Sequence, residues 1–195
     1  MSKLNLKLWL FSVVLILVRI LDAYLTYVIT PDLRYEANPL VSIWNHGWMT
    51  LFFVNIIVVL LCILLLYYSM KYPSNSFPSE KDYSFKEFVS YYLYNDKNAF
   101  HKIYFIPPYN RKSILSFCGF TFTRIFILWS IVVVIHNLGI LFSETYRYYI
   151  NLYRLWIYLY SLLIPITFYY FWIFFRIEYK KYKNNSSYSF RYVQR

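Results

Sequence analysis

Four long apolar stretches constrain this sequence more than any other feature. They run over residues 6–29, 49–70, 113–142 and 146–175. A helix needs about 20 apolar residues to cross the hydrocarbon core of a bilayer, and each stretch is long enough. Irregular backbone is excluded from contact with lipid, because its polar groups would find no hydrogen-bond partner there. The sequence therefore predicts an all-α, polytopic membrane helical bundle with four transmembrane helices.

The polar segments around these stretches predict one membrane domain. Residues 1–183 would hold the four spans and a cytoplasmic connector over 71–112, and residues 184–195 would form a polar C-terminal tail. Within the connector, the piece FKEFVSYYLYN has apolar residues near helical spacing, which predicts an amphipathic helix. The apolar run from Leu8 to Ile29 follows Lys3 and Lys7, as in a signal peptide, but it is long, holds Arg19 and Asp22 and lacks a small-residue cleavage site, so we expect a retained span.

The distribution of charge predicts the topology. The net charge is +11, which in a soluble protein would suggest nucleic acid. Here most Lys and Arg residues flank the apolar stretches, as the positive-inside bias requires, and we expect no nucleic-acid partner. The N-terminus, the connector and the tail are basic, whereas the loop over 30–47 is not. Four spans place the basic segments on one side, which predicts cytoplasmic termini and a multi-pass protein of the inner cell membrane.

Several polar residues lie within or beside the predicted spans, where charge is costly. In the expected topology most of them belong to the non-cytoplasmic half of the bundle. At about 100° per residue, Arg19, Asp22 and Thr26 share one stripe of the first span. Polar stripes in lipid must turn inward, which predicts a polar pocket roofed by the 30–47 loop. The residues predicted to form this binding pocket are Arg19, Asp22, Thr26, Glu36, Asn38, Asn137, Arg147 and Arg154.

Two interpretations of the pocket involve no catalysis. In the structural one, Asp22 pairs with Arg19 on its own helix, or with Arg124 or Arg154 across helices, and the pairs fix helix register. In the other, the pocket takes an anionic ligand at an arginine-rich mouth. The function predicted first is therefore a non-catalytic membrane component that binds a membrane lipid, or another membrane protein, through an outward-facing polar pocket.

The alternative function is a membrane-embedded, metal-dependent hydrolase that acts on a lipid or peptide at the outer leaflet. Its candidate catalytic residues are Asp22, Glu36 and His136, and its candidate metal ligands are Asp22, Glu36, His46 and His136. Carboxylate and imidazole groups suit a divalent cation, which could activate water. The sequence contains neither HExxH nor GxSxG. A divalent metal is the cofactor of this alternative alone, and the sequence identifies no other.

One motif carries a resemblance to a known family. Asp22-x3-Thr26 is followed by Glu36-x-Asn38-Pro39 and by Gly47 before the second span. This pattern resembles a family of small bacterial and archaeal membrane proteins of unknown function, whose first span carries Asp-x3-Thr and whose next loop carries Glu-x-Asn-Pro. The resemblance covers about residues 15–60. It implies that Asp22, Thr26, Glu36 and Asn38 form one linked unit, and it supplies no reaction.

Overall fold

The computed structural model describes residues 3–33, 41, 43–44, 47–72, 77–80, 82–153 and 155–193. Within these ranges all regular secondary structure is helical, which confirms the predicted all-α class. Four described helical segments are long and apolar enough to cross a membrane, as predicted. These segments are Asn5–Ile29, Trp48–Lys71, Arg111–Phe142 and Ile157–Asn184.

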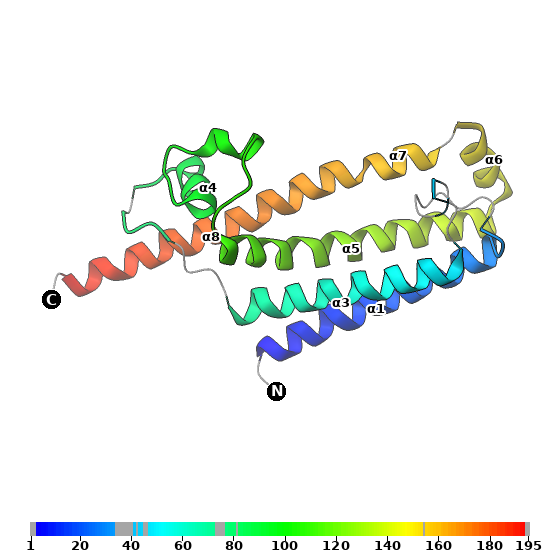
Figure 1. Ribbon diagram of the computed structural model, residues 1–195, viewed down its shortest axis with the longest axis horizontal. Helices are drawn as coiled ribbons and strands as arrows, with labels where there is room; N and C mark the ends of the chain where they lie inside the picture. The colour runs from blue at the N-terminus through cyan, green and yellow to red at the C-terminus, as the bar shows by residue number, and fades with distance from the viewer. Residues whose placement is uncertain are drawn as a thin grey trace. The chain divides into compact units, whose positions relative to one another are not determined.

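The helices follow the chain in a simple order (Figure 1). The first three spans correspond to α1 (Lys3–Ile29), α3 (Trp48–Lys71) and α5 (Arg111–Phe142). Between α3 and α5 lie α4 (Phe85–Tyr94) and the 3-10 helix η1 (Phe100–Tyr104). After α5 come α6 (Glu144–Tyr153), α7 (Leu155–Ser161) and α8 (Leu163–Val193). The stretch expected to form one span over 146–175 is thus divided, and its apolar segment begins later and runs further.

Pro165 explains why α7 and α8 are separate helices. Proline has no amide N–H, so the carbonyl of Ser161 loses the donor that a continuous helix would supply. Just before it, the N–H of Leu162 is shared between the carbonyls of Tyr158 and Leu159, at 3.2 and 3.0 Å. Such a shared bond is typical of a helix end.

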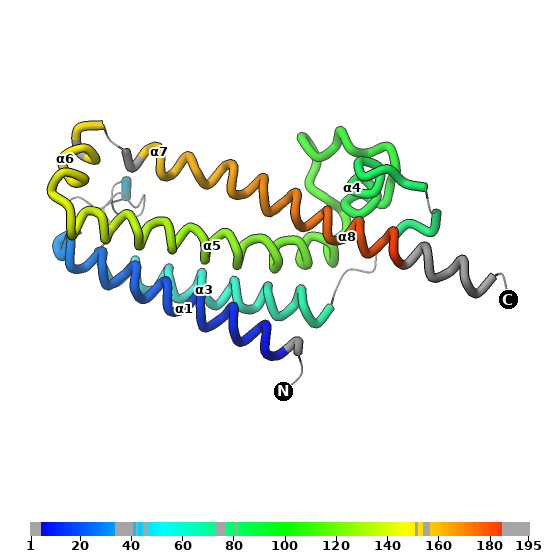
Figure 2. Tube along the Cα trace, turned by 180° about the vertical axis from the view of Figure 1, so that it is seen from behind, coloured from blue at the N-terminus to red at the C-terminus, as the bar shows by residue number. Residues whose placement is uncertain are grey.

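Two compact units divide the chain, and each is described by itself. The first unit comprises Met1–Leu64 and Phe122–Thr167, and the second comprises Leu65–Thr121 and Phe168–Arg195. In the first unit α1, α3 and α5 lie side by side, as the two opposite views show (Figures 1 and 2). The end of α1 is joined to the start of α3 by Trp48, whose indole N–H donates to the Pro31 carbonyl at 2.8 Å. The ring of Tyr27 packs edge-on against this indole at 5.6 Å.

One face of α5 holds the first unit together through small and polar side chains seven residues apart. Thr123, Ser130 and Asn137 occupy this face, and all three are buried. The hydroxyl of Thr123 donates to the Cys62 carbonyl on α3 at 3.2 Å. Small side chains let helix backbones approach closely in a membrane, and the polar groups bond across the interface. The same face of α5 carries Ser130 and Asn137 to the side chains of Arg19 and Asp22 on α1.

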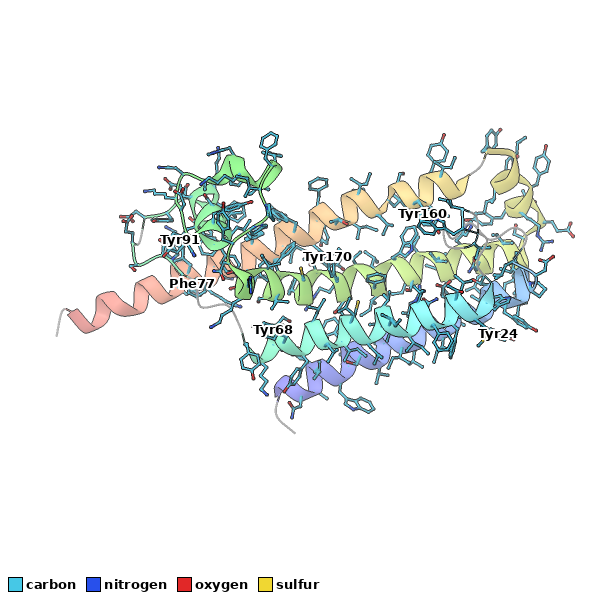
Figure 3. The ribbon with its side chains drawn as sticks, in the orientation of Figure 1. Tyr24, Tyr68, Phe77, Tyr91, Tyr160 and Tyr170 are labelled. Carbon is cyan, nitrogen blue, oxygen red and sulfur yellow. The ribbon has the colours of Figure 1, made fainter. Side chains whose placement is uncertain are left out.

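The second unit has an aromatic core. On α4, Phe88 and Tyr92 are fully buried. The ring of Phe88 lies 5.3 Å from that of Tyr182 on α8, and the ring of Tyr92 lies 5.6 Å from that of Phe175, also on α8. Figure 3 shows Phe77 and Tyr91, two of the partly buried side chains packed against this core, in the part of the chain around α4. The helix expected at FKEFVSYYLYN therefore exists, and its apolar face packs against α8.

Two tyrosines of α8 also bind the backbone that leads into α4. The hydroxyl of Tyr182 donates to the Glu80 carbonyl at 2.5 Å and accepts the N–H of Tyr83 at 3.3 Å. The hydroxyl of Tyr179 donates to the Tyr83 carbonyl at 3.0 Å. These bonds satisfy backbone groups that the aromatic core would otherwise bury unpaired.

A capping box fixes the first turn of α4. The Ser84 hydroxyl accepts the N–H of Glu87, and the Glu87 carboxylate accepts the N–H of Ser84 at 2.8 Å. The backbone bond from Ser84 is the main cause that lowers the pKa of the Glu87 carboxyl. At the other end, Asn95 adopts a left-handed conformation, with φ of 55°, and ends the helix.

This cap predicts a pH dependence of stability. A carboxyl whose pKa is lower in the folded state stabilises the fold above its unfolded pKa, about 4.3 for Glu, and the stabilisation is lost as the pH falls through the folded value. Glu87→Gln retains a capping amide but cannot titrate. We expect the difference in melting temperature between the natural chain and Glu87→Gln, measured by circular dichroism in detergent, to shrink between pH 6 and pH 3. A difference in melting temperature that is constant over this range would contradict a stabilising role of the ionised Glu87 carboxylate in the cap.

Candidate binding site

A cavity of about 240 Å³ lies in the first unit, among α1, α3, α5 and α7. Its polar lining comes from three of these helices. The polar residues that line it include Arg19, Asp22, Thr26, Asn55, His136 and Asn137. Cavities in helical bundles commonly form ligand sites, in which a few polar groups are set within an apolar wall.

Arg19 is the centre of the polar network around the cavity. One terminal nitrogen of its guanidinium donates to the Asp22 carboxylate at 2.8 Å and to the Ser130 hydroxyl at 3.3 Å. The other terminal nitrogen donates to the side-chain oxygen of Asn55. The third nitrogen, Nε, is buried and has no hydrogen-bond partner within the described residues. A single arginine of α1 is thus bonded to side chains of both α3 and α5.

Asp22 balances the charge of this arginine. Its second oxygen faces the amide nitrogen of Asn137 at 3.5 Å, and the residue is 8% exposed. The carboxylate is therefore bonded on its own helix by Arg19 and approached across the helices by Asn137. Buried charge is tolerated when it is paired and hydrogen-bonded. The pair contributes no net charge to the interior of the bundle.

Aromatic side chains form the apolar part of the wall. Trp48 of α3, Trp129 of α5 and Tyr160 of α7 all line the cavity. The rings of Trp129 and Tyr160 lie 5.3 Å apart, and Figure 3 shows Tyr160 on the side of α7 that faces α5. Large rings exclude water from the neighbouring polar groups, which strengthens the electrostatic attraction between Arg19 and Asp22.

His136 lies at the edge of the cavity and has a partner of its own. Its Nδ1 is 3.0 Å from the hydroxyl of Tyr146, the first tyrosine of α6. The ring of Tyr146 lies over Gly139, where an added Cβ would come within 2.7 Å of it. The next residue, Arg147, donates two hydrogen bonds to the Ile140 carbonyl, at 2.9 and 3.2 Å. These contacts hold α6 against the end of α5.

The predicted site residues have different outcomes. Arg19, Asp22, Thr26, Asn137 and His136 all line the same cavity. Arg147 does not line it and binds a carbonyl of α5 instead. Four predicted residues lie outside the described part of the chain: Glu36, Asn38, His46 and Arg154.

Asp22 pairs with Arg19 on its own helix, which was the first of the structural alternatives. Its carboxylate is bonded to Arg19, whereas the guanidinium of Arg124 lies 4.6 Å from the ring of Phe11. Within the residues that the structure describes, no group of three or more His, Cys, Asp and Glu side chains could hold a metal ion. The proposed metal set included Glu36 and His46, so that hypothesis stays a prediction.

Sequence reasoning missed part of the site. Ser130, Trp129 and Tyr160 were not singled out, although all three belong to the network or the cavity wall. One signal was present, because Ser130 precedes Asn137 by seven residues and therefore shares its helix face. The two aromatic residues gave no signal, since an aromatic side chain in a span can face lipid as readily as the interior of the bundle. Asn55 of α3 also belongs to the network, because its side-chain oxygen accepts a hydrogen bond from Arg19.

Comparison with known proteins adds one finding. Residues 13–79 match a family described as a domain of unknown function (DUF5658). No curated protein and no solved structure matches the chain significantly. The matched region includes α3 and the part of α1 from residue 13 onward, and therefore contains Arg19, Asp22 and Asn55. The match agrees with the expected resemblance to an uncharacterised family, and it supplies no activity.

Proposed function

We propose that this chain is a non-catalytic, multi-pass component of the inner cell membrane whose cavity binds the polar headgroup of a membrane lipid. The observation that carries the proposal is a cavity among α1, α3, α5 and α7 whose wall combines polar side chains with aromatic rings, and to which Arg19 contributes. Arg19 lines the cavity, and its buried Nε has no acceptor among the described residues. Buried donors in proteins nearly always have a hydrogen-bond acceptor, and the oxygen of a lipid headgroup is an acceptor that the bilayer supplies.

The shape of the site favours a lipid over a protein partner. A concave space of about 240 Å³ accommodates a small polar group and cannot receive the flat face of a helix. Its wall combines hydrogen-bonding groups such as Thr26 and Asn137 with the rings of Trp48 and Trp129. This mixture suits a molecule that has a polar end and an apolar body.

The charge distribution supports an orientation for this function. With cytoplasmic termini, the second half of α1 and the first turns of α3 belong to the outer side. Thr26 and Trp48 line the cavity and belong to these two segments, and Thr30, which directly follows α1, also lines it. The proposed ligand would therefore come from the outer leaflet. The metal-dependent hydrolase is the second hypothesis, and it requires Glu36 and His136 beside Asp22.

Filling the cavity tests the proposal. Ala23 lines the cavity, whereas Ile20 lies on the same helix, is 61% exposed and does not line it. We expect Ala23→Phe to lower the amount of co-purified lipid, measured by mass spectrometry of the folded protein, by about tenfold, which corresponds to about 1.4 kcal/mol of binding energy. Ile20→Phe should retain the lipid.

Two results would contradict the proposal. One is equal lipid retention by Ala23→Phe and Ile20→Phe, which would show that lipid binds elsewhere on the apolar surface. The other is a stoichiometric divalent metal, found by elemental analysis of the natural chain and lost in Asp22→Asn, because it would favour the hydrolase.

A further inference from the structure

An exposed aromatic loop, which begins at the last residue of η1, leads to α5 in the second unit. Its sequence is YFIPPY, over residues 104–109, and α5 begins two residues later. The exposed fractions are 75% for Tyr104, 86% for Phe105 and 62% for Tyr109. Three large aromatic side chains thus project from one short segment at the entrance to a membrane span.

Hydrogen bonds hold the backbone of this loop in place. The N–H groups of Phe105 and Ile106 both donate to the Lys102 carbonyl, at 3.0 and 2.8 Å. The Ile106 carbonyl accepts the hydroxyl of Tyr94, on α4, at 2.7 Å. The Tyr94 ring also packs edge-on against Tyr109, at 6.0 Å. The loop is therefore a fixed platform, and the projection of its aromatic rings is built into the fold.

Basic residues follow the aromatic ones. Arg111 and Lys112 form the first turn of α5, and both are exposed. Within the described residues neither forms an ion pair, although Lys102 pairs with Asp96 and Lys97 pairs with Glu87, each at 3.5 Å. The positive charge beside the loop is thus uncompensated, whereas two lysines nearby in the sequence are paired.

We propose that residues 104–109 insert their aromatic rings into the interfacial layer of an anionic leaflet, and that Arg111 and Lys112 bind the lipid phosphates there. Aromatic rings favour the headgroup level of a bilayer, and basic residues beside a span favour anionic lipid. Because Arg111 begins a span, the loop lies by covalent connection next to a membrane surface. This site involves other residues than the cavity and does not depend on the cavity's ligand.

The test places a fluorescent label in the loop of the full chain. A nitrobenzoxadiazole label would be attached to Phe105→Cys, and in the control to Asn98→Cys, an exposed position in the same unit, both after Cys62→Ser and Cys118→Ser. Each protein would be reconstituted into nanodiscs of phosphatidylglycerol or of phosphatidylcholine. Quenching would be measured with a spin-labelled lipid and with aqueous iodide. Circular dichroism would show that each labelled chain is folded.

We expect the label at Phe105→Cys to be quenched by the lipid-borne group and protected from iodide, with the reverse at Asn98→Cys. Each Lys or Arg near an anionic surface favours binding about fivefold, so Arg111→Gln with Lys112→Gln should reduce the preference for phosphatidylglycerol by about 25-fold. The proposal is overturned if iodide reaches both labels equally, which would leave the rings available to a protein partner. It is also overturned if lipid composition and the two basic residues have no effect on the quenching.

Discussion

Asp22→Asn is expected to lower the free energy of unfolding by about 3–5 kcal/mol, which is the usual loss when one partner of a buried ion pair is removed. The substitution preserves the shape of the side chain and removes only its charge. Arg19 would then keep its bonds to Ser130 and Asn55 but lose its counter-charge. Thermal or denaturant unfolding in detergent, followed by circular dichroism, measures the loss.

The two partners of this pair should differ in their effects. A carboxylate left alone in hydrocarbon can become neutral by taking up a proton, whereas a guanidinium stays charged. We therefore expect Arg19→Met to be less damaging than Asp22→Asn. The matched control is Glu144→Gln, which removes a carboxylate from an exposed position of α6 and should change stability by less than about 0.5 kcal/mol. Equal stability of Asp22→Asn and Glu144→Gln would contradict a structural role for the pair.

Gly119→Ala is expected to produce the second large loss. In the second unit, α5 passes so close to α3 at this point that an added Cβ would lie 2.0 Å from the carbonyl oxygen of Leu65 and 2.7 Å from the Cβ of Ser69. The obstacle is backbone, so one helix must move. Overpacking of this kind typically costs about 1–3 kcal/mol or more. Without a clash, alanine would stabilise the helix relative to glycine by about 1 kcal/mol. A loss of stability in Gly119→Ala would therefore show that the added Cβ meets α3.

The other two glycines of the chain provide controls for this prediction. An added Cβ at Gly47 would meet nothing within 4 Å, so Gly47→Ala should be neutral. At Gly139 it would meet the ring of Tyr146, a side chain that can turn away, so the loss should be intermediate. Melting temperatures of the three variants should follow this order. Similar melting temperatures for Gly47→Ala and Gly119→Ala would show that the helices are not in close contact there.

The membrane-spanning helices were predictable because the thickness of a bilayer sets their length and excludes charge from most positions. The shared face of Arg19 and Asp22 was predictable for a similar reason, since their spacing of three residues follows the helical repeat. Their partners on other helices were not, because the rotation of α5 about its axis decides which of its polar side chains reach Arg19 and Asp22. That rotation depends on packing along the whole helix and not on any one residue.

The second unit was the least predictable part of the fold. Aromatic residues make up 25% of the chain, and in a membrane protein such residues occupy lipid-facing and interfacial positions as readily as buried ones. Nothing local distinguishes Phe88, which is fully buried, from Phe105, which is almost fully exposed. The difference arises from the packing of α4 against α8, and these two helices lie far apart in the sequence.

The central claim is that Arg19 and Asp22 form one neutral unit, in which each charge is tolerated inside the bundle because the other balances it. The most direct test is the unfolding free energy of Arg19→Met combined with Asp22→Leu, compared with that of Asp22→Leu alone. Removing a buried pair completely is often nearly neutral, so the second substitution should restore at least half of the stability that the first removed. A double variant less stable than Asp22→Leu would show that the two charges act separately, and would contradict the account.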